Sequence, residues 1–140
     1  MKSCFWLLFI TWELPQAILA AAIIFFYRKK ITSSEYYNNS RIVYIKGFPG
    51  GISLGRIIIL NSRYAGDDLP KKHEYGHCRQ SLFLGWVYLL VVGLPSILRV
   101  LVWRARKLES KKYYLGYPED WANRLGFEKK DYLEAKKRLK

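Results

Sequence analysis

The segment Leu69–Val92 contains the pentapeptide His73-Glu74-Tyr75-Gly76-His77, which a long apolar run follows. The chain has only these two histidines, and residues four apart share one face of a helix, so both imidazoles can bind one metal ion. Glu74 then lies beside the remaining metal position, where a carboxylate can take a proton from an attacking water. The pattern predicts one helix over residues 69–92 that carries a zinc hydrolase site. The alternative is a pair of helix-surface histidines that bind nothing.

A third zinc ligand must come from outside the pentapeptide, because catalytic zinc sites usually have three protein ligands. Cys78 points about 100° away from His77 around the helix, and Cys4 lies in an apolar run, so we expect both to be buried thiols. Glu119 is the best carboxylate, since Pro118 suits the first turn of a helix and Asn123 follows one turn later. The Asn123 amide would then hold a histidine N–H. Acids also favour helix starts without any metal, and Glu109, Asp67 and Asp68 remain rivals.

Motifs spread over residues 12–126 resemble one family. They are the pentapeptide with Gln80-Ser81, Leu84-Gly85, Tyr88-Leu89 and Gly93-Leu94-Pro95-Ser96, then Trp12-Glu13-Leu14-Pro15-Gln16, Gly51-Ile52-Ser53-Leu54-Gly55 and Glu119–Gly126. Together they resemble small membrane-associated bacterial metallopeptidases of the gluzincin type. The resemblance implies that Glu119 is the third zinc ligand and that an acid four residues later braces the first zinc histidine. This chain departs from the family at Asn123, where an amide can accept the hydrogen bond but carries no charge, so the bracing would be weaker.

Composition separates the chain from ordinary soluble domains. It is 51% hydrophobic and 16% aromatic, with a net charge of +13 over 140 residues. Residues 4–27 are apolar enough and long enough to cross a bilayer of about 30 Å, and Arg28-Lys29-Lys30 follows them. We therefore expect residues 1–30 to be an N-terminal membrane helix. Glu13 and Pro15 favour a bent or interfacial helix, and a cleaved signal peptide is the other alternative.

Residues 31–140 are expected to form the metallopeptidase-like domain. Residues 31–40 read as a polar linker, and the β-branched runs 41–46 and 56–60 flank a Gly-rich turn, which predicts a small hairpin. By the family resemblance, this hairpin would hold an extended peptide along its strand edge. A ribbon that only packs against the helices is equally compatible with the pattern.

Residues 82–103 form a second apolar segment that is long enough to cross a bilayer. A straight crossing would separate the histidines from Glu119, whereas zinc ligands lie within about 2.2 Å of the metal. Gly93 and Pro95 predict a break that turns the chain back, so we expect a re-entrant or membrane-associated helical hairpin. If the segment did cross, Asp67, Asp68 or Glu35 would have to supply the third ligand.

Basic residues suggest how the protein meets the membrane. Lys2 alone precedes the first apolar run, whereas three basic residues follow it, which predicts that the catalytic part faces the cytoplasm. Residues 104–140 contain twelve Lys and Arg against six Asp and Glu, which suits anionic headgroups. Nucleic acid is not an expected partner, because no recognised binding motif accompanies the charge.

The predicted fold is mainly α with a small β hairpin or sheet (α+β). The predicted function is a membrane-associated zinc-dependent peptidase that hydrolyses peptide or protein substrates. His73, His77 and Glu119 would bind Zn²⁺, Glu74 would activate water, and a phenol from the stretch before Glu119 would stabilise the oxyanion. The candidates for that role are Tyr113, Tyr114 and Tyr117. The alternatives are a catalytically inactive metal-binding membrane protein and, less favoured, a basic membrane protein that binds nucleic acid or anionic lipid.

Overall fold

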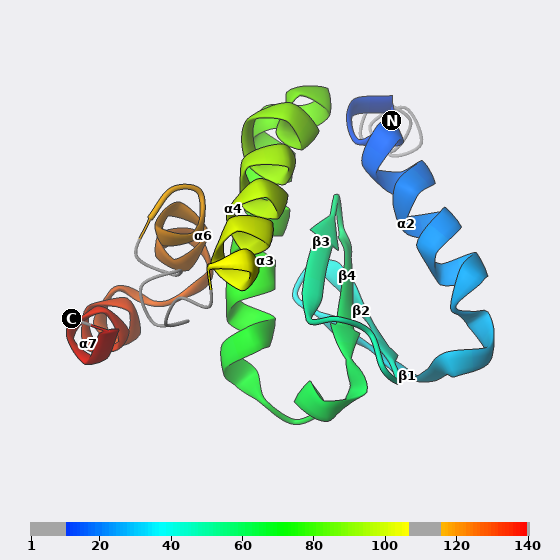
Figure 1. Ribbon diagram of the computed structural model, residues 1–140, viewed down its shortest axis with the longest axis horizontal. Coiled ribbons are helices and arrows are strands. Elements are labelled where there is room, and N and C mark those ends of the chain that lie inside the picture. Colours follow the sequence, from blue (N-terminus) through cyan, green and yellow to red (C-terminus); the bar gives the residue numbers. More distant parts are fainter. Residues whose placement is uncertain (1–10, 107–115, 140) are drawn as a thin grey trace.

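The computed structural model describes residues 11–106 and 116–139. These residues form a mixed α/β fold in which a small sheet lies between α2 on one side and α3 on the other (Figure 1). The mainly α prediction with a minor β element is confirmed. The helices are α2 (Leu14–Phe26), α3 (Asp68–Leu84), α4 (Leu94–Ala105), α6 (Glu119–Gly126) and α7 (Lys129–Leu139), and the strands are β1 (Ile31–Tyr37), β2 (Ser40–Ile45), β3 (Gly51–Leu54) and β4 (Ile57–Asn61).

The sheet has the strand order β1-β2-β4-β3, and two sequence predictions about it were wrong. Residues 31–40 are not a linker, because Ile31–Tyr37 is β1 and pairs antiparallel with β2. The runs 41–46 and 56–60 do not form a hairpin, because β2 and β4 run parallel. The chain between them forms β3, and Gly55, at φ 64°, turns it tightly back into β4. The edge strand next to the candidate site is therefore β3.

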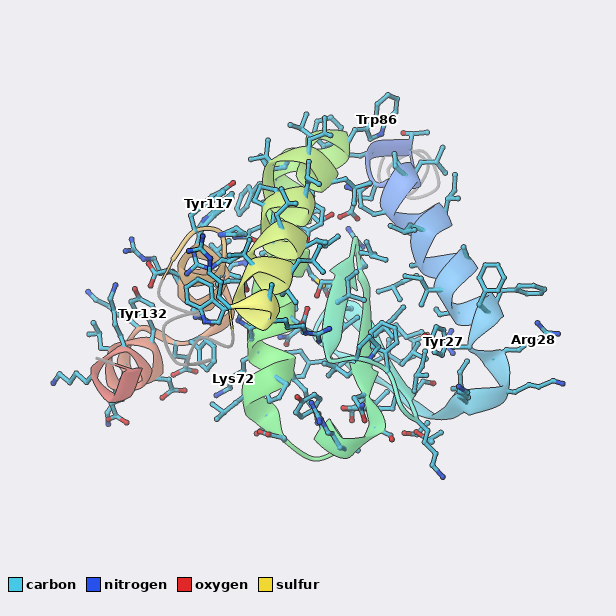
Figure 2. The ribbon with its side chains drawn as sticks, in the orientation of Figure 1. Tyr27, Arg28, Lys72, Trp86, Tyr117 and Tyr132 are labelled. Carbon is cyan, nitrogen blue, oxygen red and sulfur yellow. The ribbon has the colours of Figure 1, made fainter. Side chains whose placement is uncertain are left out.

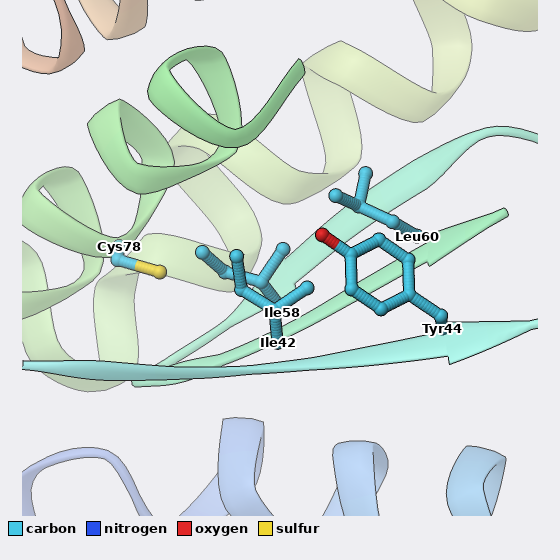
Figure 3. Close-up of a cluster of buried hydrophobic side chains, with 5 residues drawn as sticks. All are labelled: Ile42, Tyr44, Ile58, Leu60 and Cys78. Atoms are coloured by element: carbon cyan, nitrogen blue, oxygen red, sulfur yellow. The ribbon is translucent and has the colours of Figure 1, made fainter. Parts of the chain in front are cut away.

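The central strands are buried on both faces, as expected for apolar β-branched runs. Towards α3, a cluster of side chains from β2 and β4 packs against Cys78 (Figure 3). Towards α2, the alternate residues Val43, Ile45 and Ile59 pack against Ile23 and other side chains of that helix. The α3-facing cluster contains Ile42, Tyr44, Ile58, Leu60 and Cys78. This packing holds α3, and with it the histidines, against one face of the sheet.

The predicted helical hairpin is present, but it breaks earlier than expected. Helix α3 ends at Leu84, and the chain passes through a 3₁₀ turn and a π-helical turn, Gly85–Gly93, which we call the elbow, before α4 begins. Gly85 makes the break because it adopts φ 53°, and a Cβ there would overlap the indole of Trp12. Pro95 lies in the first turn of α4, where a backbone N–H has no acceptor within the helix. A proline there therefore costs no helical hydrogen bond. The predicted single helix over 69–92 and the predicted break at Gly93–Ser96 were therefore wrong.

The described residues contain no single helix that is both long and apolar enough to cross a bilayer. Among these residues, Asp68–Val87 and Leu89–Ala105 are long and apolar enough only when taken together, and the chain bends by 119° between them. Within the predicted membrane helix over 4–27, helix α2 has 13 residues, and residues 4–10 lie outside the described part. The described part of the predicted N-terminal membrane helix is therefore α2, which is by itself too short to cross a bilayer.

Polar side chains around the start of α2 bond to the end of α3 and to the first residue of the elbow. Trp12 Nε1 donates to the carbonyl of Leu82 at 3.1 Å, and Gln16 Nε2 donates to the carbonyl of Gly85 at 2.5 Å. Ser81 Oγ donates to Oε1 of Glu13 at 2.9 Å. The polar residues that interrupt the first apolar run therefore face the protein and tie α2 to the end of α3.

Candidate metal centre

The two helices that carry the candidate ligands touch backbone to backbone. A Cβ on Gly76 would overlap the carbonyl of Ala122, and a Cβ on Gly126 would overlap the carbonyl of Lys72. Glycine at these two positions lets α6 lie directly on α3. Because Glu119 is the first residue of α6, this approach brings its carboxylate to the histidine face of α3.

His73, His77 and Glu119 converge on one point. Nε2 of His73 lies 3.0 Å from Oε2 of Glu119, and Nε2 of His77 lies 3.1 Å from the same oxygen. The three side chains are 13%, 7% and 1% exposed, respectively. Two ligands about 2.1 Å from a tetrahedral zinc lie about 3.4 Å apart, so only small shifts separate this cluster from a zinc site. Two imidazoles and one carboxylate form a usual donor set for catalytic zinc.

The electrostatics of the cluster favour a cation at its centre. Burial alone would raise the pKa of the Glu119 carboxyl, but hydrogen bonds from His73 and His77 hold that pKa well below its usual range. Burial alone would lower the pKa of His73, but the Glu119 hydrogen bond and the Glu74 charge raise it to about 9. The Glu119 carboxyl is therefore ionised in this cluster, as a metal ligand must be.

The outward nitrogen of each histidine has its own partner. Nδ1 of His73 lies 2.7 Å from Oδ1 of Asn123, the bracing contact that the sequence predicted. Nδ1 of His77 lies 2.7 Å from Oε1 of Gln80, and Gln80 Nε2 donates to the carbonyl of Pro118 at 3.2 Å. An amide oxygen can only accept, so both histidines carry hydrogen on Nδ1 and present Nε2 towards the centre.

Glu74 lies beside the cluster but is held by the sheet. Ser53 Oγ lies 2.7 Å from Oε2 of Glu74, to which it donates, and equally close to the Glu74 backbone oxygen. Gly51, two residues earlier on β3, leaves room for the carboxylate, because a Cβ there would overlap Oε1 of Glu74. The edge strand therefore sets the position of Glu74, which is 8% exposed.

The cluster and Glu74 line a common cavity of about 1020 Å³. Its walls are β3, the elbow and the face of α4 that carries Leu94, Ile97 and Leu101. Helix α4 is joined to the metal cluster because Ser96 Oγ donates to Oε1 of Glu119 at 2.6 Å. The volume is close to the upper limit of the range for ligand cavities, about 300–1,000 Å³.

The rival third ligands lie elsewhere. Asp67 caps α3 by accepting from the N–H of Leu69, Asp68 is exposed, and Glu35 accepts from the Tyr44 hydroxyl at 2.6 Å and pairs with Lys71. Glu109 lies outside the described residues. Among the described residues, the cluster of potential metal ligands is His73, His77 and Glu119.

Of the three candidate oxyanion tyrosines, the described residues include Tyr117, and it does not line the cavity. Tyr113 and Tyr114 lie outside the described part. Tyr117 is 52% exposed, stacks on Trp121 and donates its hydroxyl to the carbonyl of Val91 (Figure 2). The cavity is lined instead by Tyr64 and Tyr88, of which Tyr88 donates to the carbonyl of Ser53 at 3.1 Å.

Sequence reasoning did not assign roles to Gly51, Ser53, Gln80 or Ser96. Gln80 alone had a local signal, because it lies three residues after His77 on the same helix. The buried-thiol prediction is confirmed for Cys78, where burial raises the pKa to about 12, and Cys4 lies outside the described residues. Comparisons of the chain with protein-family models, with curated proteins and with solved structures found no match.

Proposed function

We propose that this protein is a membrane-associated zinc-dependent metallopeptidase. One observation carries the proposal: a buried His-His-Glu cluster shares a cavity with a second carboxylate, Glu74, that is not part of the cluster. A structural zinc site would normally be closed by a fourth protein ligand, whereas a hydrolytic site keeps one position open. Zinc held by His73, His77 and Glu119 would supply a Lewis acid for hydrolysis of a peptide bond.

Glu74 is the general base and then the general acid in this proposal. It would take a proton from the attacking water and return it to the departing amide nitrogen. Ser53 orients the carboxylate by donating to Oε2, which leaves the rest of the carboxylate for the water. Asn123 and Gln80 hold the histidines in the tautomer that presents Nε2 to the metal.

The edge strand β3 suits an extended substrate. In the described part of the chain β3 is paired with β4 alone, and all four residues of β3 line the cavity. A peptide can add to such an edge through main-chain hydrogen bonds, with its side chains alternating between the two faces of the sheet. A scissile bond held there lies beside Glu74, because Gly51 and Ser53 contact that residue directly.

Membrane association is supported by an exposed apolar surface where the start of α2 meets the elbow. We call it the apolar apex: Trp12, Phe83, Trp86, Val87 and Leu90, between 48% and 69% exposed. Figure 2 shows Trp86 at this apex and Arg28 at the opposite end of α2. Such a surface suits shallow insertion into one leaflet.

The proposal is tested on protein purified in detergent. Zinc content is measured by mass spectrometry for the wild type and for His77→Ala, Glu119→Ala and Glu74→Gln, with Asp120→Asn as a control next to Glu119. We expect near-stoichiometric zinc in the wild type, Glu74→Gln and Asp120→Asn, and strong loss in the other two. Hydrolysis of a quenched peptide library should then be abolished in Glu74→Gln. Zinc without hydrolysis in the wild type would favour the inactive metal-binding alternative, and absence of zinc would refute the proposal.

A further inference from the structure

The cavity differs in chemistry from one end of β3 to the other. At the Leu54 end, Tyr88 of the elbow bonds to the carbonyl of Ser53. At the Gly51 end, Arg104 Nη2 donates to the carbonyl of Pro49 at 3.1 Å. Helix α4 therefore runs lengthwise over β3, with its start near Leu54 and its end near Gly51, and the cavity lies between them.

The end next to the elbow is apolar. It is lined by Leu19 of α2, Leu54 of β3 and Leu90 of the elbow, and Leu90 is also part of the apolar apex. Leu19, Leu90 and Leu94 are 42%, 69% and 49% exposed although they line the cavity. The cavity thus opens through exposed aliphatic side chains that continue into the surface proposed to enter the bilayer.

The opposite end is basic. Arg104 and Arg63 both line the cavity there. Arg63 comes two residues after Asn61, whose side chain donates to the carbonyl of Phe48, and this contact places it near the Gly51 end. Neither arginine has a carboxylate within 4.0 Å among the described residues. Both guanidinium groups are exposed, so they can pair with acidic groups of a ligand lying along β3.

We infer that the cavity binds the juxtamembrane segment of a membrane protein, an extended stretch that is apolar where it leaves the bilayer and acidic beyond it. This inference rests on the proposed peptidase function and names its substrate class. An apolar stretch fits the Leu19–Leu90 end, the backbone pairs with β3 beside Glu74, and acidic side chains meet Arg63 and Arg104. The apolar-to-basic order of the cavity and the position of the apex set which end of the segment lies next to the bilayer.

The inference is tested by binding, separately from hydrolysis. Fluorescent peptides are titrated into zinc-loaded Glu74→Gln protein in neutral detergent at physiological salt, and anisotropy is recorded. One peptide has Leu and Phe residues followed by Asp residues, a second has the same apolar run followed by Lys, and a third has Ser followed by Asp. We expect the first to bind about tenfold more tightly than either of the others.

Matched variants separate the cavity from the overall positive charge. Reversing Arg63→Glu and Arg104→Glu together should weaken the acidic peptide about tenfold and favour the Lys peptide, whereas the double variant Lys29→Glu, Arg41→Glu, which has the same change in net charge away from the cavity, should not. Ile97→Asp should weaken both apolar peptides, whereas Leu98→Asp should not, because only Ile97 lines the cavity although each is 52% exposed.

The outcomes separate this inference from the peptidase proposal. Equal binding of the three peptides, or equal effects of the cavity variants and their controls, would overturn the inference even if the wild type hydrolyses peptides. Selective binding lost in the cavity variants supports the inference. If the wild type then cleaves none of the peptides, the ligand class is retained and the peptidase proposal fails.

Discussion

Gly76 lies against the backbone carbonyl of Ala122 so closely that a side chain at position 76 would overlap it. This contact joins the helix that carries both histidines to the helix that carries Glu119. The metal centre therefore depends on a residue that contributes no ligand. Gly76 lies inside the His-Glu-Tyr-Gly-His motif, so one pentapeptide supplies two candidate ligands, the proposed general base and a close backbone contact with α6.

Replacing Gly76→Ala should separate α3 from α6 and move Glu119 away from the histidines. Since altered support of a zinc ligand typically costs about 10–100-fold in affinity, we expect a loss at or above that range. The measurement is zinc affinity by competition with a chelator, with circular dichroism to confirm that the helices remain. Gly93→Ala is the control, because the nearest atom to its new Cβ would be 3.7 Å away. Wild-type affinity in Gly76→Ala would contradict this account.

Asn123 offers a second test of the metal centre. Its Oδ1 accepts from Nδ1 of His73, and a carboxylate in the same place would make that imidazole a stronger ligand. Asn123→Asp should therefore raise zinc affinity several-fold, whereas Asn123→Leu should lower it by about 10–100-fold. Asn39→Asp introduces the same charge in an exposed turn and should change nothing. Equal gains in both Asp variants would mean that net charge, and not the His73 contact, is responsible.

The candidate metal ligands could be predicted because the geometry within each helix is local. His73, Glu74 and His77 lie within one turn of helix, and Glu119 and Asn123 lie one turn apart on another. Gly51 and Ser53 could not be assigned, because their contacts with Glu74 depend on where the edge strand packs against α3. Rival acids such as Asp68 could be excluded as the third ligand only from the contact between α3 and α6, which brings Glu119 to the histidines.

The errors in the fold have similar causes. Strand β1 was missed because five of its seven residues are exposed, so no apolar alternation marks it. The parallel pairing of β2 and β4 depends on β3, whose four residues include a glycine and a serine and give a weak strand signal. Gly85 and Gly93 look alike in sequence, and only packing against Trp12 makes Gly85 the site of the break.

Substituting Gly51→Ala should separate metal binding from catalysis. The new Cβ would displace the Glu74 carboxylate without touching the three ligands, so we expect zinc content to remain and peptide hydrolysis to fall by about 10²–10⁴-fold. Both are measured on the same preparation by mass spectrometry and a quenched-peptide assay. Ile52→Val, on the neighbouring strand position, should retain most activity. Concurrent loss of zinc in Gly51→Ala would show that β3 supports the metal centre itself.

Charges placed at the apolar apex should release the protein from membranes. Phe83 and Val87 are 62% and 51% exposed, and burying such side chains in lipid contributes about 1.5–3 kcal/mol each. The double variant Phe83→Glu, Val87→Glu should therefore bind vesicles of phosphatidylcholine and phosphatidylserine at least about tenfold more weakly in flotation assays. Leu133→Glu, on α7 and 48% exposed, should bind as the wild type does. Wild-type binding should also weaken as salt rises, because the net charge of +13 contributes through screened attraction to the anionic lipid. If Leu133→Glu released the protein as effectively as the double variant, net charge alone would explain the binding and the apex would have no part in it.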